Sequence, residues 1–224
     1  MGVTEDKVVL CFGDSNTWGF NPANGDRYPY GTRWPGVLTA GLASGLGAGF
    51  RVVEEGLNGR TTAFEDFQEQ GRNGKQLLPV LLRTHAPIDL VVIMLGTNDV
   101  KPRFGVRAED IGLAMGTLAD VVLTSGAGPG YEAPRILLVS PPPISRLPEC
   151  FFPSQFDATS ITKSQELPRC YEAVAKERGC GFFDAARAAV CSEVDGVHLD
   201  VEGHRGLGEV LVDVVQEIFG RKSI

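Results

Sequence analysis

The 224-residue sequence lacks the features that mark several protein classes. No apolar run approaches the ~18 residues that cross a membrane, and the lysines and arginines form no basic cluster. The formal net charge of −7 argues against nucleic acid or an anionic membrane surface as the main partner. The acidic opening MGVTEDK leads straight into an apolar stretch, so we expect no secretory signal peptide.

Cysteine and histidine are also scarce. The five cysteines are an odd number without a CxxC pair, which predicts no disulfide framework and a reducing, cytoplasmic location. The sequence has only three histidines. The acidic and histidine residues between 195 and 204 are therefore poor evidence for a two-metal site, because such sites need several ligands from different strands. The glycines at 45, 47 and 49 follow no strand, so they are no dinucleotide fingerprint. We therefore expect neither a metal nor a cofactor.

Strand and helix patterns alternate five times along the chain. Short runs rich in Val, Ile, Leu and Phe predict strands, and longer amphipathic stretches predict helices. The predicted strands are 8–12, 50–55, 89–95, 135–140 and 181–184, and the predicted helices are 34–46, 74–84, 108–125, 160–179 and 201–219. This α/β alternation predicts a five-stranded parallel sheet with helices on both faces, a three-layer α/β/α sandwich. No linker or repeat divides the chain, so we expect residues 1–224 to form a single domain.

The first predicted strand delivers a serine onto a turn. Residues 8–12 are apolar, Gly13 interrupts the run, and Asp14 and Ser15 follow as turn residues. Open α/β sheets place their chemistry at the carboxyl ends of central strands. An ordinary turn after a strand is the alternative interpretation of this stretch.

Four polar segments are expected at that same edge of the sheet. They are GDS at 13–15, GLNG at 56–59, GTND at 96–99 and DGVH at 195–198. Each motif alone is common in loops. Because the carboxyl ends of parallel strands share one edge, the four segments together indicate a site assembled from distant parts of the chain.

The residue types in these segments suit nucleophilic catalysis. A serine hydroxyl needs a general base, and His198 is the histidine expected at the correct edge. Asp195 precedes it by three residues and can hold its Nδ1, leaving Nε2 to take the proton of Ser15. His85 is expected at a helix end on the opposite edge, and His204 as a packing or solvated residue of the last helix.

An oxyanion needs hydrogen-bond donors where negative charge develops. The candidate donors are the backbone N–H groups of Ser15 and Gly56 and the side-chain amide of Asn98. Gly56 is chosen because glycine permits close approach of a ligand to the main chain. A simple turn after the third strand is the alternative role of Asn98.

The four segments resemble, in order and approximate spacing, the blocks of the SGNH (GDSL-type) hydrolase family. The stretches CFGDSNTWGF, EEGLNGRTT, VVIMLGTNDVK and LVSPPP are similar to its arylesterase and acyltransferase branch. The resemblance implies a flavodoxin-like sheet. It also implies Ser15 as nucleophile, Gly56 and Asn98 as oxyanion donors, and Asp195 and His198 as the rest of a triad.

Residues and resemblance together predict a serine esterase that forms an acyl-enzyme on Ser15. Its expected substrates are short-chain acyl esters of the acetyl type, aryl or alkyl, with acyl transfer to alcohols as a second outcome. A carbohydrate acetylesterase is the alternative, and a metal-dependent phosphoesterase or a non-catalytic binding module on the same fold are weaker ones. Asn16 departs from the Leu of the family motif, but it lies outside the catalytic set.

The neighbouring loops suggest how a substrate and other subunits are bound. Asp14 and Trp18 are candidate substrate-binding residues, and Trp18 with the apolar loop 144–156 is expected to wall a small pocket for the ester. Loops 20–32 and 144–156 are long and carry apolar residues. They predict a homo-oligomer, as does the resemblance, since that branch assembles through long loops.

Overall fold

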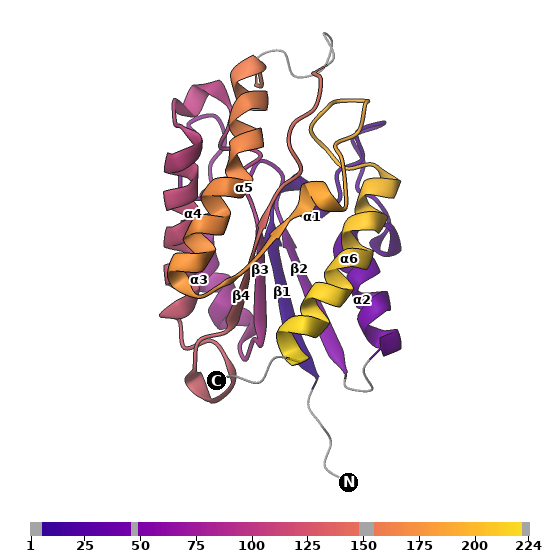
Figure 1. The fold of residues 1–224 in the computed structure, drawn as a ribbon, viewed down its shortest axis with the longest axis vertical. Coiled ribbons are helices and arrows are strands. Elements are labelled where there is room, and N and C mark those ends of the chain that lie inside the picture. Colours follow the sequence, from indigo (N-terminus) through magenta and orange to yellow (C-terminus); the bar gives the residue numbers. More distant parts are fainter. Residues whose placement is uncertain (1–5, 46–48, 148–154, 221–224) are drawn as a thin grey trace.

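The computed structural model describes residues 6–45, 49–147 and 155–220 of the chain (Figure 1). Five parallel strands form one sheet in the order β2-β1-β3-β4-β5, which is the flavodoxin-like order. The strands are β1 (Lys7–Gly13), β2 (Phe50–Gly56), β3 (Leu90–Met94), β4 (Arg135–Ser140) and β5 (Gly181–Asp184). The predicted sheet is confirmed.

Helices cover both faces of this sheet. They are α1 (Ser15–Trp18), α2 (Trp34–Gly45), α3 (Gly74–His85), α4 (Ala108–Leu123), α5 (Ala158–Arg178) and α6 (Val201–Gly220). Short 3₁₀ turns span Tyr30–Thr32, Pro102–Phe104, Pro129–Tyr131 and Ala185–Arg187. Figure 1 shows α3, α4 and α5 on one face and α2 with α6 on the other, which confirms the three-layer sandwich.

The alternation of β1 explains why both faces are covered. Its residues Leu10 and Phe12 point into the core beneath α3, α4 and α5, whereas Val9 and Cys11 point into the core beneath α2 and α6. Side chains of a strand alternate between the two faces, and both sets are fully buried here. An apolar strand of this kind is stable only between two layers of helices.

The register brings three strand ends together. Gly13 at the end of β1 lies opposite Gly56 of β2 and Met94 of β3. The chain runs from β1 outward to β2 and then crosses back to β3 on the other side of β1. This reversal of strand order is the switch point where open α/β sheets hold ligands.

The helix predictions differ from the structure in details. The sequence pattern missed α1, a single turn that begins at Ser15. Helix α5 begins at Ala158 because the side chain of Asp157 accepts hydrogen bonds from the next turn, and Pro168 lies inside it without ending it. The last residue of the predicted helix 34–46, Leu46, lies outside the described residues. In the described ranges, we find no helix long and apolar enough to cross a membrane.

A buried tyrosine closes the end of β3. The hydroxyl of Tyr171 on α5 donates a 2.9 Å hydrogen bond to the carbonyl oxygen of Leu95, and a side chain at Gly96 would lie 2.4 Å from that hydroxyl oxygen. This contact holds the start of the GTND turn against α5.

We predict that Tyr171→Phe lowers the free energy of unfolding by about 1–2 kcal/mol, because the Leu95 carbonyl is left buried without its partner. Urea unfolding followed by circular dichroism measures the change. The matched control is Tyr131→Phe, since Tyr131 is 92% exposed. Equal midpoints for the two variants would contradict the prediction.

Candidate active site

Ser15 lies at the start of α1, directly after the central strand. The side chain of Asp14 caps this turn by accepting a 2.9 Å hydrogen bond from the backbone N–H of Asn16. A side chain at Gly13 would lie 2.0 Å from the hydroxyl oxygen of Thr17. Glycine at position 13 therefore lets the chain turn tightly and present the Ser15 hydroxyl at the edge of the sheet.

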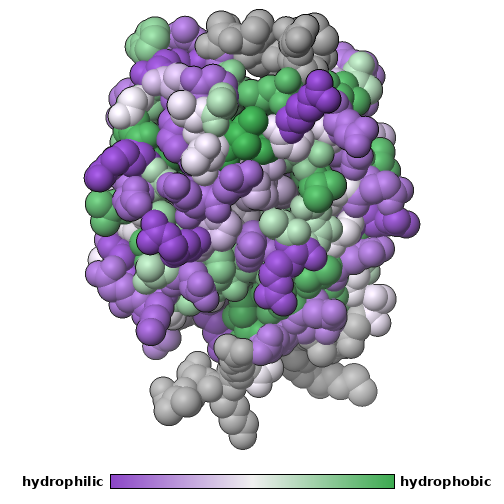
Figure 2. All heavy atoms as spheres, turned by 45° about the horizontal axis from the view of Figure 1, so that its top comes forward, coloured by the Kyte–Doolittle hydropathy of each residue, from purple (hydrophilic) through white to green (hydrophobic). Residues whose placement is uncertain are grey.

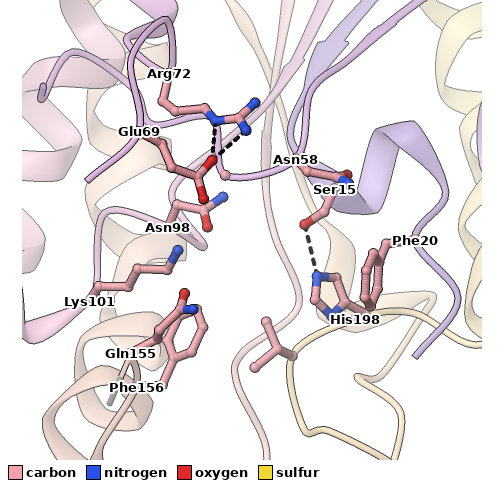
Figure 3. A pocket seen from close by; sticks show the side chains of 12 residues that line it. Ser15, Phe20, Asn58, Glu69, Arg72, Asn98, Lys101, Gln155, Phe156 and His198 are labelled. Carbon is pink, nitrogen blue, oxygen red and sulfur yellow. Dashed lines mark hydrogen bonds and ion pairs between the residues drawn. The ribbon is translucent and has the colours of Figure 1, made fainter. Parts of the chain in front are cut away.

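The structure brings Ser15, His198 and Asp195 together (Figure 3). The Ser15 Oγ atom lies 2.9 Å from Nε2 of His198, and Nδ1 of His198 lies 2.5 Å from Oδ2 of Asp195. Asp195 Oδ1 accepts two further hydrogen bonds of 2.9 Å, from the backbone N–H groups of Val197 and His198. An imidazole that donates from Nδ1 to a carboxylate has Nε2 available to accept the serine proton.

Asp195 is held in its ionised form. Its burial alone would raise the pKa of the carboxyl group, but the hydrogen bonds from His198 and from the backbone outweigh burial and keep that pKa below its ordinary value. The negative charge of Asp195 is therefore present at neutral pH. A carboxylate in this position can orient His198 and can stabilise an imidazolium formed when His198 takes a proton.

Asn16 ties the nucleophile turn to the loop that carries His198. Its Nδ2 donates a 3.3 Å hydrogen bond to the carbonyl of Val197, and its Oδ1 accepts a 2.9 Å hydrogen bond from the N–H of Leu199. The ring of Phe20 packs on the imidazole of His198 at a centroid distance of 4.3 Å. These contacts fix the position of the imidazole, although the sequence assigned no role to Asn16 or Phe20.

Asn98, which the sequence predicts as an oxyanion donor, lies at the pocket that Ser15 also lines. It follows β3 and lines the pocket in front of Ser15. One hydrogen of its Nδ2 is donated to the carbonyl of Arg60 at 3.0 Å, and an amide nitrogen carries two hydrogens. The second hydrogen is thus left for a ligand in the pocket.

Arg60 contacts the strand ends next to Ser15 and also Asn98. From the sequence alone, Arg60 was assigned no role. It is only 3% exposed, and its guanidinium donates to the carbonyl oxygens of Gly13, at 2.8 Å, and Glu55. The same group lies over the ring of Phe12. Burial lowers the pKa of Arg60 to about 10, so the side chain stays cationic at neutral pH. Arg60 thereby joins the ends of β1 and β2 and holds the amide of Asn98.

The placement predicted for Gly56 is corrected by the structure. Gly56 ends β2 and faces α1, where a side chain would lie 2.1 Å from the backbone nitrogen of Trp18. The residues of this segment that line the pocket are Asn58 and Gly59. Gly59 has a φ of 78°, a conformation that favours glycine. Gly56 and Gly59 are three residues apart in the sequence. Only the conformation of the loop determines which of them lines the pocket.

Asp14 and Trp18 do not line the pocket, so their prediction as substrate-binding residues is also corrected. Asp14 is 1% exposed and serves as the cap of α1. The ring of Trp18 stacks with the guanidinium of Arg27 at 5.0 Å. Phe20 takes the place in the pocket that was expected for Trp18.

The pocket has a volume of about 330 Å³ and two unlike walls. Figure 3 shows Ser15, His198 and Phe20 on one side and Glu69, Arg72, Asn98, Lys101, Gln155 and Phe156 on the other. From the described part of loop 144–156, Gln155 and Phe156 line the pocket. Phe151 and Phe152 of this loop lie outside the described residues.

The acidic and histidine residues near the last helix do not converge on one point. Asp195 is bonded to His198, whereas Asp200 caps α6 at the N–H of Gly203. His204 is buried and accepts from the backbone N–H of Trp34, and burial lowers its pKa to about 4. Among the residues that the structure describes, no group of three or more His, Cys, Asp or Glu is placed to hold a metal ion. The packing role expected for His204 is the one observed.

A serine, a histidine and an aspartate joined in this way at the switch point of a flavodoxin-like sheet form the arrangement of a serine hydrolase. The chain belongs to the GDSL-like lipase/acylhydrolase family, whose model matches residues 11–205. Together with the solved structures described next, this membership makes it a carboxylic ester hydrolase.

Solved structures similar to this chain agree with the family. The native aryl esterase of M. smegmatis is 43% identical, with a TM-score of 0.88 over 94% of this chain and 99% of that chain. A carbohydrate acetylesterase from Sinorhizobium meliloti is 40% identical, with a TM-score of 0.89 over 96% of this chain and 100% of that chain. A lipolytic G-D-S-L protein of Veillonella parvula, at 18% identity and a TM-score of 0.66 over 94% of this chain and 98% of that chain, shares the fold. A comparison with curated proteins gave no significant match.

We predict that Asp195→Asn lowers kcat about 10³- to 10⁴-fold, because the amide stabilises neither the imidazolium nor the required tautomer of His198. The control is Asp200→Asn, which makes the same chemical change in the next turn of chain, where Asp200 caps α6. Steady-state assays with an activated acetate ester measure kcat for both variants. If Asp195→Asn kept most of the wild-type kcat, the role given to Asp195 would be wrong.

Proposed function

We propose that this chain is a serine esterase that hydrolyses short-chain acyl esters through an acyl-enzyme on Ser15. The observation that carries the proposal is the pair of buried hydrogen bonds that join Ser15 Oγ to His198 and His198 to Asp195. Its placement beside the amide of Asn98 supports acyl transfer as the reaction type, since nucleophile, base and oxyanion donor face one pocket.

The reaction begins when Nε2 of His198 takes the proton of Ser15 as Oγ attacks the ester carbonyl. The carbonyl oxygen becomes an oxyanion, and we assign its donors as the N–H of Ser15, the N–H of Gly59 and Nδ2 of Asn98. His198 then gives the proton to the leaving alcohol, which departs as the acyl-enzyme forms. In the second half, His198 takes a proton from water as the water oxygen attacks the acyl carbon. His198 then returns that proton to Ser15 Oγ as the acyl–Oγ bond breaks, which releases the acid and restores Ser15.

A small cavity supports short acyl groups as substrates. A volume of about 330 Å³ is at the low end for ligand sites, and Phe20 and Phe156 bound it with aromatic rings. Aryl and alkyl acetates fit these walls. The aryl esterase among the similar structures supports the same class.

An acetylated sugar is the second candidate substrate. The wall formed by Glu69, Arg72 and Gln155 offers hydrogen-bond donors and acceptors to hydroxyl groups, and a carbohydrate acetylesterase is among the similar structures. An alcohol bound in place of water would take the acyl group. Competition between water and an added alcohol for one acetate ester measures how much transfer occurs.

We further propose that the protein is a cytoplasmic homo-oligomer. In loop 20–32, Tyr30 is 44% exposed, and hydrophobic side chains form several small patches on the face seen in Figure 2. In the described part of loop 144–156, Ile144 and Phe156 are buried. The free state of the four described cysteines supports a reducing location. A single monomeric species in sedimentation at micromolar concentration would contradict the assembly.

We predict that Ser15→Ala lowers the hydrolysis of p-nitrophenyl acetate by about 10³-fold or more, because no nucleophile remains to form the acyl-enzyme. Ser44→Ala, an exposed change on α2, serves as control. A chelator is expected to leave the wild-type rate unchanged. Full activity of Ser15→Ala would overturn the proposal, and loss of activity with chelator that a metal salt restores would favour a metal-dependent phosphoesterase.

We predict that kcat/KM is highest for acetyl to butyryl p-nitrophenyl esters and falls for longer chains, because the cavity is small. Phe156→Leu removes ring volume from its wall and is expected to raise the octanoate-to-acetate ratio several-fold. Phe67→Leu, at a side chain that is 77% exposed, should leave that ratio unchanged. A wild-type preference for long chains would refute the assigned acyl size.

A further inference from the structure

Lys101 is a buried lysine whose ammonium group faces the pocket. It follows the GTND turn and is only 5% exposed, yet it lines the cavity on the wall across from His198. Figure 3 shows its Nζ directed into the cavity beside Asn98 and above Phe156. Lys101 has no role in the acyl transfer proposed for Ser15 and His198.

The pocket-lining cation Arg72 and the neighbouring cation Arg103 are already paired. Arg72 forms an ion pair with Glu69, and Arg103 forms one with Asp66. Over the ranges that the structure describes, no carboxylate lies within ion-pair distance of the Lys101 ammonium. Its Nζ makes a cation–π contact with Phe156, 5.2 Å from the centroid of the ring. A buried charge is costly unless it is paired, and one cation–π contact compensates only part of that cost.

The charge on Lys101 is present at neutral pH. Burial, together with the nearby charge of Arg103, lowers the pKa of Lys101 to about 8, while Asp66, Glu69 and Asp14 act in the opposite direction. The pair of Glu69 and Arg72 contributes no net charge. The polar wall of the pocket therefore presents one uncompensated positive charge to a ligand.

We propose that Lys101 binds an anionic substituent of the substrate, so that the preferred esters carry a carboxylate. The inference rests on the proposed esterase function and names the substrate class of the same site. A carboxylate beside Nζ would supply the partner that the protein does not provide, in a charge-assisted hydrogen bond. The carboxylate can belong to the acyl part or to the alcohol part of the ester, and the test separates the two sources.

The test compares pairs of esters that differ only in charge. Mono-p-nitrophenyl succinate and its neutral methyl ester place the charge on the acyl part, and 4-acetoxybenzoate and its methyl ester place it on the alcohol part. The measured quantity is the ratio of kcat/KM for the anionic ester to kcat/KM for its neutral partner. This ratio cancels any general loss of activity in a variant.

We expect Lys101→Met to lower that ratio about tenfold for at least one pair, the loss of one charge-assisted hydrogen bond. Lys101→Arg keeps the charge and should retain most of the ratio. The control Lys176→Met removes an equal charge from an exposed position on α5 and should leave the ratio at its wild-type value. The pair that responds identifies the source of the carboxylate.

A second measurement uses the wild-type protein alone. The ratio should fall as the pH rises through about 8, because Lys101 loses its proton there, and it should stay flat in Lys101→Met. The other charged groups that face this lysine are Asp14, Asp66, Glu69 and Arg103. A pH-dependent change in the catalytic step itself enters both rates of a pair, and the Lys101→Met profile measures any part that does not cancel.

Equal ratios in wild type and Lys101→Met, or a wild-type ratio that does not change with pH, would overturn the proposal. Such a result leaves the esterase function intact as long as Ser15→Ala is inactive on the neutral esters. If Ser15→Ala instead hydrolyses the neutral esters at the wild-type rate, it is the esterase mechanism that fails.

Discussion

The hydrogen bond between Ser15 Oγ and His198 Nε2 joins residues 183 positions apart, and the rest of the site depends on it. The two side chains meet because β1 is placed inside the sheet and the loop before α6 returns to the same edge. Asn16 then fixes the register between the two segments through Val197 and Leu199. The parallel sheet thus supplies the proximity, and a few side-chain contacts supply the geometry.

Several of the polar groups buried around this bond are hydrogen-bonded to one another. Asp195 accepts from His198 and from two backbone N–H groups, and Arg60 donates to the ends of β1 and β2 while its own carbonyl holds Asn98. Unpaired groups at this depth would destabilise the fold. The same contacts set the positions of Ser15, His198 and Asn98 relative to one another, and oxyanion stabilisation requires such preorganised groups. Lys101 is not part of this hydrogen-bond network, and its lack of an ion-pair partner among the described residues is why we propose that it binds the substrate.

Much of this site follows from the sequence, but its loops do not. Strand boundaries and the triad could be predicted because apolar runs mark strands, and residues after parallel strands share an edge. Gly56 was predicted as an oxyanion donor and Asp14 and Trp18 as substrate-binding residues, but none of the three lines the pocket. Strand periodicity does not determine which way a loop residue faces. Arg60, Phe20 and Lys101 were missed for the same reason, since an isolated charge or ring in a loop resembles a surface residue until its burial is known.

The central claim is that Ser15 carries the acyl group during turnover. It is tested most directly by mixing the protein with p-nitrophenyl acetate, quenching in acid within the first turnover, and locating the added acetyl group by peptide mass spectrometry. We expect the acetyl group on the peptide that contains Ser15, and we expect it to be lost on further incubation in water. If an active protein never acquires an acetyl group there, or acquires one only on another residue, Ser15 is not the nucleophile.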